Sequence, residues 1–135
     1  MRRFAAARVL IVDDHPLNTR LVQIVLSRAG HEAFTADSAA SALDFLRHRQ
    51  VEVVITDIAM PEMGGIELLA KIREMFGAAR PRVIAYTAFA LERQRQAIAA
   101  AGFDELLVKP ATPEQILNAV CSDSRHGSPM SPAST

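Results

Sequence analysis

The stretch VVITDIAMPEMGG, residues 53–65, indicates both the fold class and the place to look for chemistry. It begins with a run of β-branched apolar residues, which is typical of a strand buried on both faces of a sheet. The run ends on one carboxylate, Asp57, and a Met-Pro pair and two glycines follow. Proline and glycine mark a loop, so the acid stands at the end of a buried strand.

The same alternation extends over the chain on both sides of this stretch. Val-, Ile- and Leu-rich runs predict strands, and segments with apolar residues at helical spacing predict helices between them. Five such strand–helix units, without a sequence repeat, predict an α/β fold with a doubly wound parallel sheet and helices on both faces. The predicted strands cover residues 8–13, 31–36, 51–57, 81–87 and 104–109.

Local signals mark where the helices begin and end. Pro16 opens the first helix, in which Leu17, Leu21, Ile24 and Val25 recur at helical spacing. The third helix follows two glycines, Gly64 and Gly65, which we expect to adopt positive φ and to allow close backbone approach. Residues 112–115 have the T-x-x-Q pattern of a capping box with proline at the first helical position, and open the last helix.

Length and composition limit the classes of protein to consider. The chain has 135 residues, half of them hydrophobic, with fifteen basic and fifteen acidic residues. Such a chain suits one domain, predicted over 8–121, with a tail over 1–7 and a disordered Ser/Pro-rich tail or linker over 122–135. Balanced charge argues against direct nucleic-acid binding. The single Cys121 fits a reducing, cytoplasmic setting, and no apolar run is long enough to span a membrane.

Polar residues recur where the predicted strands end. The first strand ends in Asp13 and Asp14, the third in Asp57, the fourth in Thr87 and the fifth in Lys109. Because the carboxyl ends of parallel strands share one edge of a sheet, where ligands bind, we expect these side chains to lie together.

Clustered carboxylates repel each other, by on the order of 4 kcal/mol per pair at ~4 Å and an effective dielectric of ~20. Either the pKa values of these acids are raised or a cation lies among them. Hard oxygen ligands such as Asp14 and Asp57, without a Cys or His set, favour Mg²⁺, which also takes phosphate oxygens. With Lys109 and Thr87 around a phosphoryl group, the candidate nucleophile is Asp57, which would form an acyl phosphate.

These motifs, in this order and spacing, resemble the receiver domain of two-component response regulators. They are VDD at 12–14, DIAMPEMGG at 57–65, YTA at 86–88 and VKP at 108–110, and the resemblance covers roughly residues 8–121. DDHPLN at 13–18 is most similar to receivers attached to, or paired with, hybrid sensor kinases.

The resemblance implies a sheet order of 2-1-3-4-5, as in flavodoxin, and phosphorylation of Asp57 by a phosphohistidine on a histidine kinase or histidine phosphotransfer protein. It implies that Asp14, Asp57 and the backbone carbonyl of Ala59 bind Mg²⁺, with Asp13 acting through water. It also implies that Thr87 and Lys109 contact the phosphoryl oxygens and that the Lys109–Pro110 bond is cis. We expect a monomer or weak dimer that signals through a downstream protein partner. It would be a phosphoacceptor catalysing only its own phosphorylation and dephosphorylation, not an enzyme acting on other substrates.

Three positions depart from the family's usual pattern. Leu106 stands where many receivers carry a Tyr or Phe that rotates as a switch, so we expect output to bypass a side-chain switch there. Ala59 and Phe89 occupy positions that influence the water attacking the acyl phosphate. Neither side chain hydrogen-bonds water, so we predict a long-lived phosphoaspartate. We interpret His15 as an exposed residue at the start of the first helix, not as a metal ligand.

Three other classes fit parts of the pattern. A flavodoxin-like FMN protein would need Ser or Thr donors where Asp13 and Asp14 stand. A Mg²⁺-dependent hydrolase with an aspartate nucleophile would need a second acid at position 59, where there is alanine. A degenerate receiver, acting only as a binding module, would have lost part of the acid, threonine and lysine set that is intact here.

Overall fold

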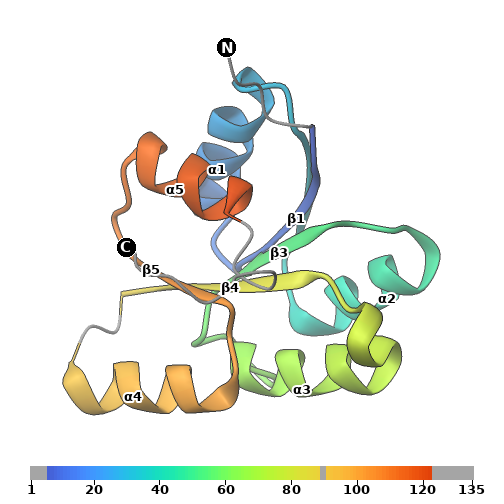
Figure 1. Ribbon diagram of the computed structural model, residues 1–135, viewed down its shortest axis with the longest axis vertical. Helices are drawn as coiled ribbons and strands as arrows, with labels where there is room; N and C mark the ends of the chain where they lie inside the picture. Colours follow the sequence, from blue (N-terminus) through green and yellow to red (C-terminus); the bar gives the residue numbers. More distant parts are fainter. Residues whose placement is uncertain (1–5, 89–90, 123–135) are drawn as a thin grey trace.

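Helices on two faces enclose a five-stranded parallel sheet in the computed structural model, which describes residues 6–88 and 91–122 (Figure 1). The sheet order is β2-β1-β3-β4-β5, which confirms the predicted doubly wound α/β fold. The strands are β1 (Arg8–Val12), β2 (Glu32–Ala36), β3 (Val53–Thr56), β4 (Arg82–Thr87) and β5 (Glu105–Val108). The terminal segments 1–5 and 123–135 lie outside the described residues, so the expected tails stay a prediction.

The helices are divided unequally between the two faces. α1 (Pro16–Arg28) and α5 (Pro113–Cys121) cover one face of the sheet (Figure 1). α2 (Ala39–His48), α3 (Gly65–Phe76) and α4 (Glu92–Ala101) lie on the other face, and a 3-10 turn (Gly77–Ala79) follows α3. The edge of the sheet formed by the carboxyl ends of the strands is therefore bordered by loops that lead to helices of both layers.

Strand β1 shows why the central strands are continuously apolar. Val9 and Ile11 belong to the core beneath α1 and α5, whereas Leu10 and Val12 belong to the core beneath α2 and α3. Successive side chains of a strand point to opposite faces, so a strand covered by helices on both faces needs apolar residues at every position. The two cores pack against both faces of the sheet and so fix the strand ends from which the loops at its edge begin.

Side-chain caps begin two of the helices. Ser38 caps α2, because its hydroxyl accepts a hydrogen bond from the Ser41 amide at 3.1 Å. The capping box before α5 is confirmed: Thr112 Oγ1 accepts from the Gln115 amide at 3.1 Å, and Gln115 Oε1 accepts from the Thr112 amide at 2.9 Å. Such caps satisfy amide groups that have no partner within the helix.

Helix α1 buries a different face from the one that its leucines indicate. The side chains packed towards the sheet are Thr19, Val22 and Leu26, while Leu17 and Leu21 are 70% and 56% exposed. Thr19 tolerates burial because its hydroxyl donates to the carbonyl of Pro16 at 2.9 Å. The helix lies where the sequence predicts it, but most of the apolar residues whose spacing predicts it face outward.

An ion pair fastens the start of β4 to the loop before β5, at the edge of the sheet opposite the acids. Arg80 donates to both carboxylate oxygens of Asp104, at 2.9 and 3.3 Å, and the Val83 amide donates to Asp104 at 2.8 Å. Burial raises the pKa of Asp104, but the hydrogen bonds from Arg80 and Val83 outweigh burial, so the pKa lies below its usual value.

Candidate functional site

The register of the strands brings their carboxyl ends to one edge. Val12 pairs with Thr56, Thr56 with Ala85, and Thr87 with Val108. The polar residues predicted from the sequence come at or just after these positions, on loops that begin at the same edge. The parallel arrangement therefore brings together side chains that are far apart in the chain.

Asp57 is held at this edge by its own backbone and by its neighbour. Its amide donates to the Val12 carbonyl at 2.9 Å, which extends the pairing of β3 with β1 by one residue. Oδ1 accepts from the Ile58 amide at 2.7 Å, and Oδ2 lies 3.3 Å from Nζ of Lys109. The side chain is 9% exposed, so its orientation is set by these contacts while it remains reachable from solvent.

Lys109 connects the acid that follows β1 with the acid that follows β3. Its Nζ donates to Asp13 Oδ2 at 2.9 Å. Burial lowers the pKa of Lys109, but the hydrogen bond to Asp13 and the charge of Asp57 outweigh burial, so the pKa is raised. Burial raises the pKa of Asp13, but the hydrogen bonds from Lys109 and from the His15 amide outweigh burial, so the pKa is lowered. Both groups are therefore charged at neutral pH.

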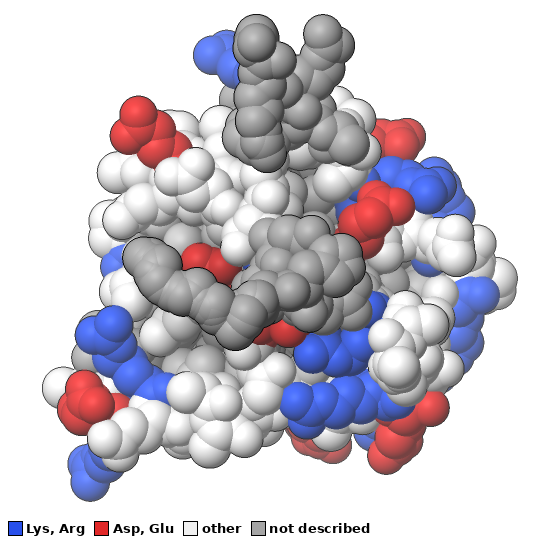
Figure 2. All heavy atoms as spheres, viewed as in Figure 1, with Lys and Arg blue, Asp and Glu red and all other residues white. Residues whose placement is uncertain are grey.

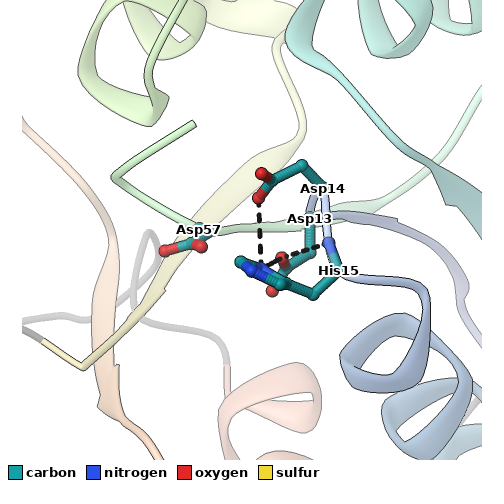
Figure 3. Close-up of side chains that lie close together, drawn as sticks. All are labelled: Asp13, Asp14, His15 and Asp57. Carbon is teal, nitrogen blue, oxygen red and sulfur yellow. Dashed lines mark hydrogen bonds and ion pairs between the residues drawn. The ribbon is translucent and has the colours of Figure 1, made fainter. Parts of the chain in front are cut away.

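Four side chains form a cluster of potential metal ligands: Asp13, Asp14, His15 and Asp57 (Figure 3). One ligand atom from each lies within 4.8 Å of the others. Within residues 6–88 and 91–122, Asp14 Oδ1 is buried and accepts no hydrogen bond. A buried anionic oxygen without a donor, next to two other carboxylates, fits a site for a hard divalent cation.

The loop after Asp57 needs its two glycines for space and not for positive φ. Gly64 has a φ of −84°, and within the described residues the positive φ of this loop is at Glu62, at 70°. The expectation of positive φ at both glycines is therefore wrong. A Cβ on Gly64 would lie 2.7 Å from the Ile58 carbonyl oxygen, and one on Gly65 would overlap the Asp57 carbonyl oxygen. The close backbone approach is confirmed, and it keeps this loop against Asp57.

An open cavity of about 310 Å³ leads to the carboxylate. Its lining brings together the predicted site residues Asp57, Ala59, Thr87 and Lys109, together with His15, Asn18 and Ala88. The Lys109–Pro110 bond is cis, as the resemblance implies. Phe89 lies outside the described residues, so its expected influence on the water attacking the acyl phosphate stays a prediction. Leu106, on β5, is half-buried and lies beside Ala85 in the sheet register.

Three residues of the site were missed or undervalued by sequence reasoning. Asn18, in the first turn of α1, donates to Asp13 Oδ2 at 3.3 Å. The ring of Tyr86 lies 5.3 Å from the Lys109 ammonium, and its hydroxyl accepts from the Ala111 amide at 3.4 Å. His15 is exposed as expected, but its ring also contacts two acids. The available signal for Asn18 was its position in the motif DDHPLN, where it is a polar residue shortly after the two acids.

Comparison with known proteins assigns the chain to a family. The chain matches the response regulator receiver domain family over residues 9–121. A Leptolyngbya boryana protein, named only as a 14.6 kDa protein in the sodA1 3' region, is 35% identical over 120 residues, covering 89% of this chain and 92% of that protein. The chain belongs to the response regulator receiver domain family, whose members act in two-component signal transduction.

Other relatives contain a similar stretch as a small part of a larger protein. The sensor histidine kinase RcsC of Escherichia coli is 38% identical over 104 residues, which cover 77% of this chain but 11% of the kinase. The chain thus spans about a tenth of that protein. This similarity supports the expected likeness to receivers of hybrid sensor kinases.

Solved structures show the same architecture. The chemotaxis protein CheY4 of Vibrio cholerae superposes with a TM-score of 0.79 at 31% identity, covering 86% of this chain and 97% of that one. The response regulator TrrA of Thermotoga maritima, solved in complex with Mg²⁺ and BeF, gives a TM-score of 0.74 at 29% identity over 84% and 95% of the two chains. Among the described residues, no helix has the length and apolar character needed to cross a membrane.

Proposed function

We propose that the chain accepts a phosphoryl group on Asp57 from a phosphohistidine of a histidine kinase or phosphotransfer protein, in a Mg²⁺-dependent reaction. Its output is phosphorylation-dependent binding of a downstream protein. The observation that carries this proposal is the position of the Asp57 carboxylate, which lies in an open cavity beside Lys109 and Thr87.

The residues that line the cavity have different roles in the proposed phosphoryl transfer. An oxygen of Asp57 attacks phosphorus, and the P–O bond forms as the P–N bond of the donor breaks, with the imidazole leaving with that bond's electron pair. Lys109, already 3.3 Å from Asp57, turns towards the phosphoryl oxygens, and the Thr87 hydroxyl contacts another of them. These contacts place positive charge and a donor where charge gathers during transfer.

The acids of the cluster would hold the metal. Asp14, Asp57 and the carbonyl of Ala59 would bind Mg²⁺ directly, and Asp13 would act through water. When bound, the ion neutralises the negative charge of the carboxylates and of the phosphoryl oxygens. The orphaned Asp14 oxygen and the oxygen-rich ligand set support this assignment.

The exposed face of α1 suits docking of the phosphodonor. Leu17, Leu21 and Ile24 are 70%, 56% and 40% exposed and lie along one side of the helix. Beside them a cavity of about 350 Å³ runs between α1 and the loop before α5. Asn18 and Lys109 line both this cavity and the one containing Asp57, so the two cavities adjoin at these residues. A partner helix with an apolar face, laid along α1, would bring its phosphohistidine to the acid.

Chemical phosphorylation tests the acceptor role. The protein is incubated with acetyl phosphate and Mg²⁺, and its intact mass is measured. A gain of one phosphoryl group that is absent in Asp57→Asn, absent with EDTA, and retained in Asp44→Asn supports the proposal; Asp44 is an exposed acid on α2. Continuous release of phosphate without accumulation would instead indicate a hydrolase, and no labelling would indicate a degenerate receiver.

A matched pair of surface variants tests the docking face. Ile24 on α1 and Ile66 on α3 have nearly equal exposure, 40% and 41%. We expect Ile24→Ser to slow transfer from a phosphorylated histidine phosphotransfer protein about 10-fold, because about 1–2 kcal/mol of apolar burial is lost. Ile66→Ser should transfer normally, and both variants should label normally with acetyl phosphate. Equal rates for the two variants would exclude α1 as the docking face.

A further inference from the structure

The ring of His15 lies beside the carboxylates at the edge of the sheet (Figure 3). Its Nδ1 is 3.2 Å from Asp13 Oδ1 and 3.3 Å from Asp14 Oδ1. The backbone amide of His15 donates to the same Asp13 oxygen at 2.9 Å, which holds the turn leading into α1. A nitrogen is therefore present in a cluster that the sequence predicts to contain only oxygen ligands.

His15 Nδ1 and Asp14 Oδ1 are separated as neighbouring ligands of one ion would be. Neighbouring ligands about 2.1 Å from a shared octahedral cation lie about 3.0 Å apart. The separation between Nδ1 and Asp14 Oδ1, 3.3 Å, is close to that value. Asp13 Oδ1, the oxygen nearest to Nδ1, already accepts from the His15 amide, whereas Asp14 Oδ1 accepts no hydrogen bond from residues 6–88 or 91–122.

The tautomer of the ring decides whether Nδ1 donates to Asp13 Oδ1, 3.2 Å away, or presents a lone pair to this space. In the neutral imidazole one nitrogen carries the proton and the other accepts. With the proton on Nε2, Nδ1 offers its lone pair towards Asp13 and Asp14. The side chain is 66% exposed, so water is available to the protonated nitrogen.

We propose that His15 supplies a nitrogen ligand to the metal ion held by Asp14 and Asp57, and so shifts the site's preference from Mg²⁺ towards divalent transition ions such as Co²⁺ and Mn²⁺. This rests on the proposed function, which assigns a metal to the same acids. Imidazole binds borderline transition ions well, whereas Mg²⁺ favours oxygen ligands. His15 is thus a determinant of metal specificity.

Binding of the metals alone, followed by calorimetry on the full chain, tests the proposal. We expect His15→Ala to weaken Co²⁺ binding about 10-fold or more and Mg²⁺ binding by less than about 3-fold. The matched control is His48→Ala, which removes an exposed histidine of α2 whose ring contacts the Asp44 carbonyl. His48→Ala should bind both ions as the wild type does.

Pulsed EPR of the Mn²⁺-loaded protein detects the nitrogen itself. We expect modulation from a directly bound ¹⁴N in the wild type and in His48→Ala, and its loss in His15→Ala. Equal weakening of both ions in His15→Ala, unchanged Co²⁺ affinity, or persistent ¹⁴N modulation would each overturn the proposal. Urea unfolding in EDTA checks that the His15→Ala variant is folded.

Failure of this inference is separable from failure of the proposed function. Labelling of wild-type Asp57 by acetyl phosphate in Mg²⁺ tests the phosphoacceptor role alone. A protein that is labelled but shows no nitrogen ligand retains the proposed function and loses this inference. A protein with a nitrogen ligand and no labelling loses the proposed function and retains His15 as a metal ligand.

Discussion

Neutralising Asp14 should stabilise the metal-free protein. Asp14 has no lysine or arginine partner among the described residues, in contrast to Asp13 and Asp57, which both contact Lys109. Carboxylate oxygens of the cluster lie within 4.8 Å of one another. At this separation two unit charges repel by about 3.5 kcal/mol at an effective dielectric of about 20.

The net gain is smaller than that figure because Lys109 already offsets the charge of both neighbouring acids. We therefore expect Asp14→Asn to raise the free energy of unfolding in EDTA by about 1–2 kcal/mol. The asparagine also adds an amide donor next to carboxylate oxygens, and the replaced Oδ1 accepts no hydrogen bond from residues 6–88 or 91–122. At an m-value of about 2 kcal/mol/M the urea midpoint should rise by about 0.5–1 M.

Adding Mg²⁺ should reverse the order of the two proteins. At about 100 times its dissociation constant, the ion should stabilise the wild type by about 2.7 kcal/mol, whereas Asp14→Asn, which lacks one of the proposed metal ligands, should gain little. The assay is urea unfolding followed by circular dichroism, with and without Mg²⁺. Asp44→Asn, the same change at an exposed position of α2, should change neither midpoint. A lower midpoint for Asp14→Asn in EDTA would refute the reasoning that this acid is held against repulsion.

Three further predictions use other parts of the molecule. Asp104→Asn should cost about 2 kcal/mol of stability near neutral pH, because charged hydrogen bonds from Arg80 are lost. The folded-state pKa of Asp104 lies below the unfolded value of 3.8, so the stability contributed by its carboxylate is present above that pH and is lost as the pH falls through the folded-state pKa. Urea unfolding should therefore show that the difference in unfolding free energy between wild type and Asp104→Asn becomes smaller as the pH falls below 3.8. Leu106→Ala should keep phosphorylation-dependent partner binding in a pull-down assay; normal phosphate uptake with lost binding would show that output uses this side chain. Phosphorylated Asp57 should decay slowly in a ³²P assay because Ala59 cannot orient water, and a half-life of seconds would contradict this.

The charge distribution on the surface is consistent with recognition of proteins. Basic and acidic side chains are interspersed on the face of the molecule drawn in Figure 2. The whole chain has a formal net charge of zero. Affinity for phosphates of nucleic acid needs an excess of basic residues, so this balance favours a protein partner.

The sequence alone was sufficient to place the acids together. A strand buried on both faces needs apolar residues at every position. Each strand can therefore be recognised in the sequence as a run of Val, Ile and Leu that ends where polar residues begin. Parallel strands share one carboxyl edge, and therefore Asp13, Asp57 and Lys109 could be assigned to one site from local patterns. The capping box before α5 could also be predicted from the sequence, because its hydrogen bonds join residues within one turn.

Only the tertiary structure decided which side of α1 is buried and where the His15 ring lies. Helical spacing defines a stripe, but α1 carries two stripes, and packing against the sheet selected the one containing Val22 and Leu26. The contacts of His15 depend on where the turn after β1 directs its ring relative to Asp14, and those of Tyr86 on how Lys109 crosses from β5. Such contacts depend on the relative placement of separate loops and strands, which no periodicity within one segment encodes.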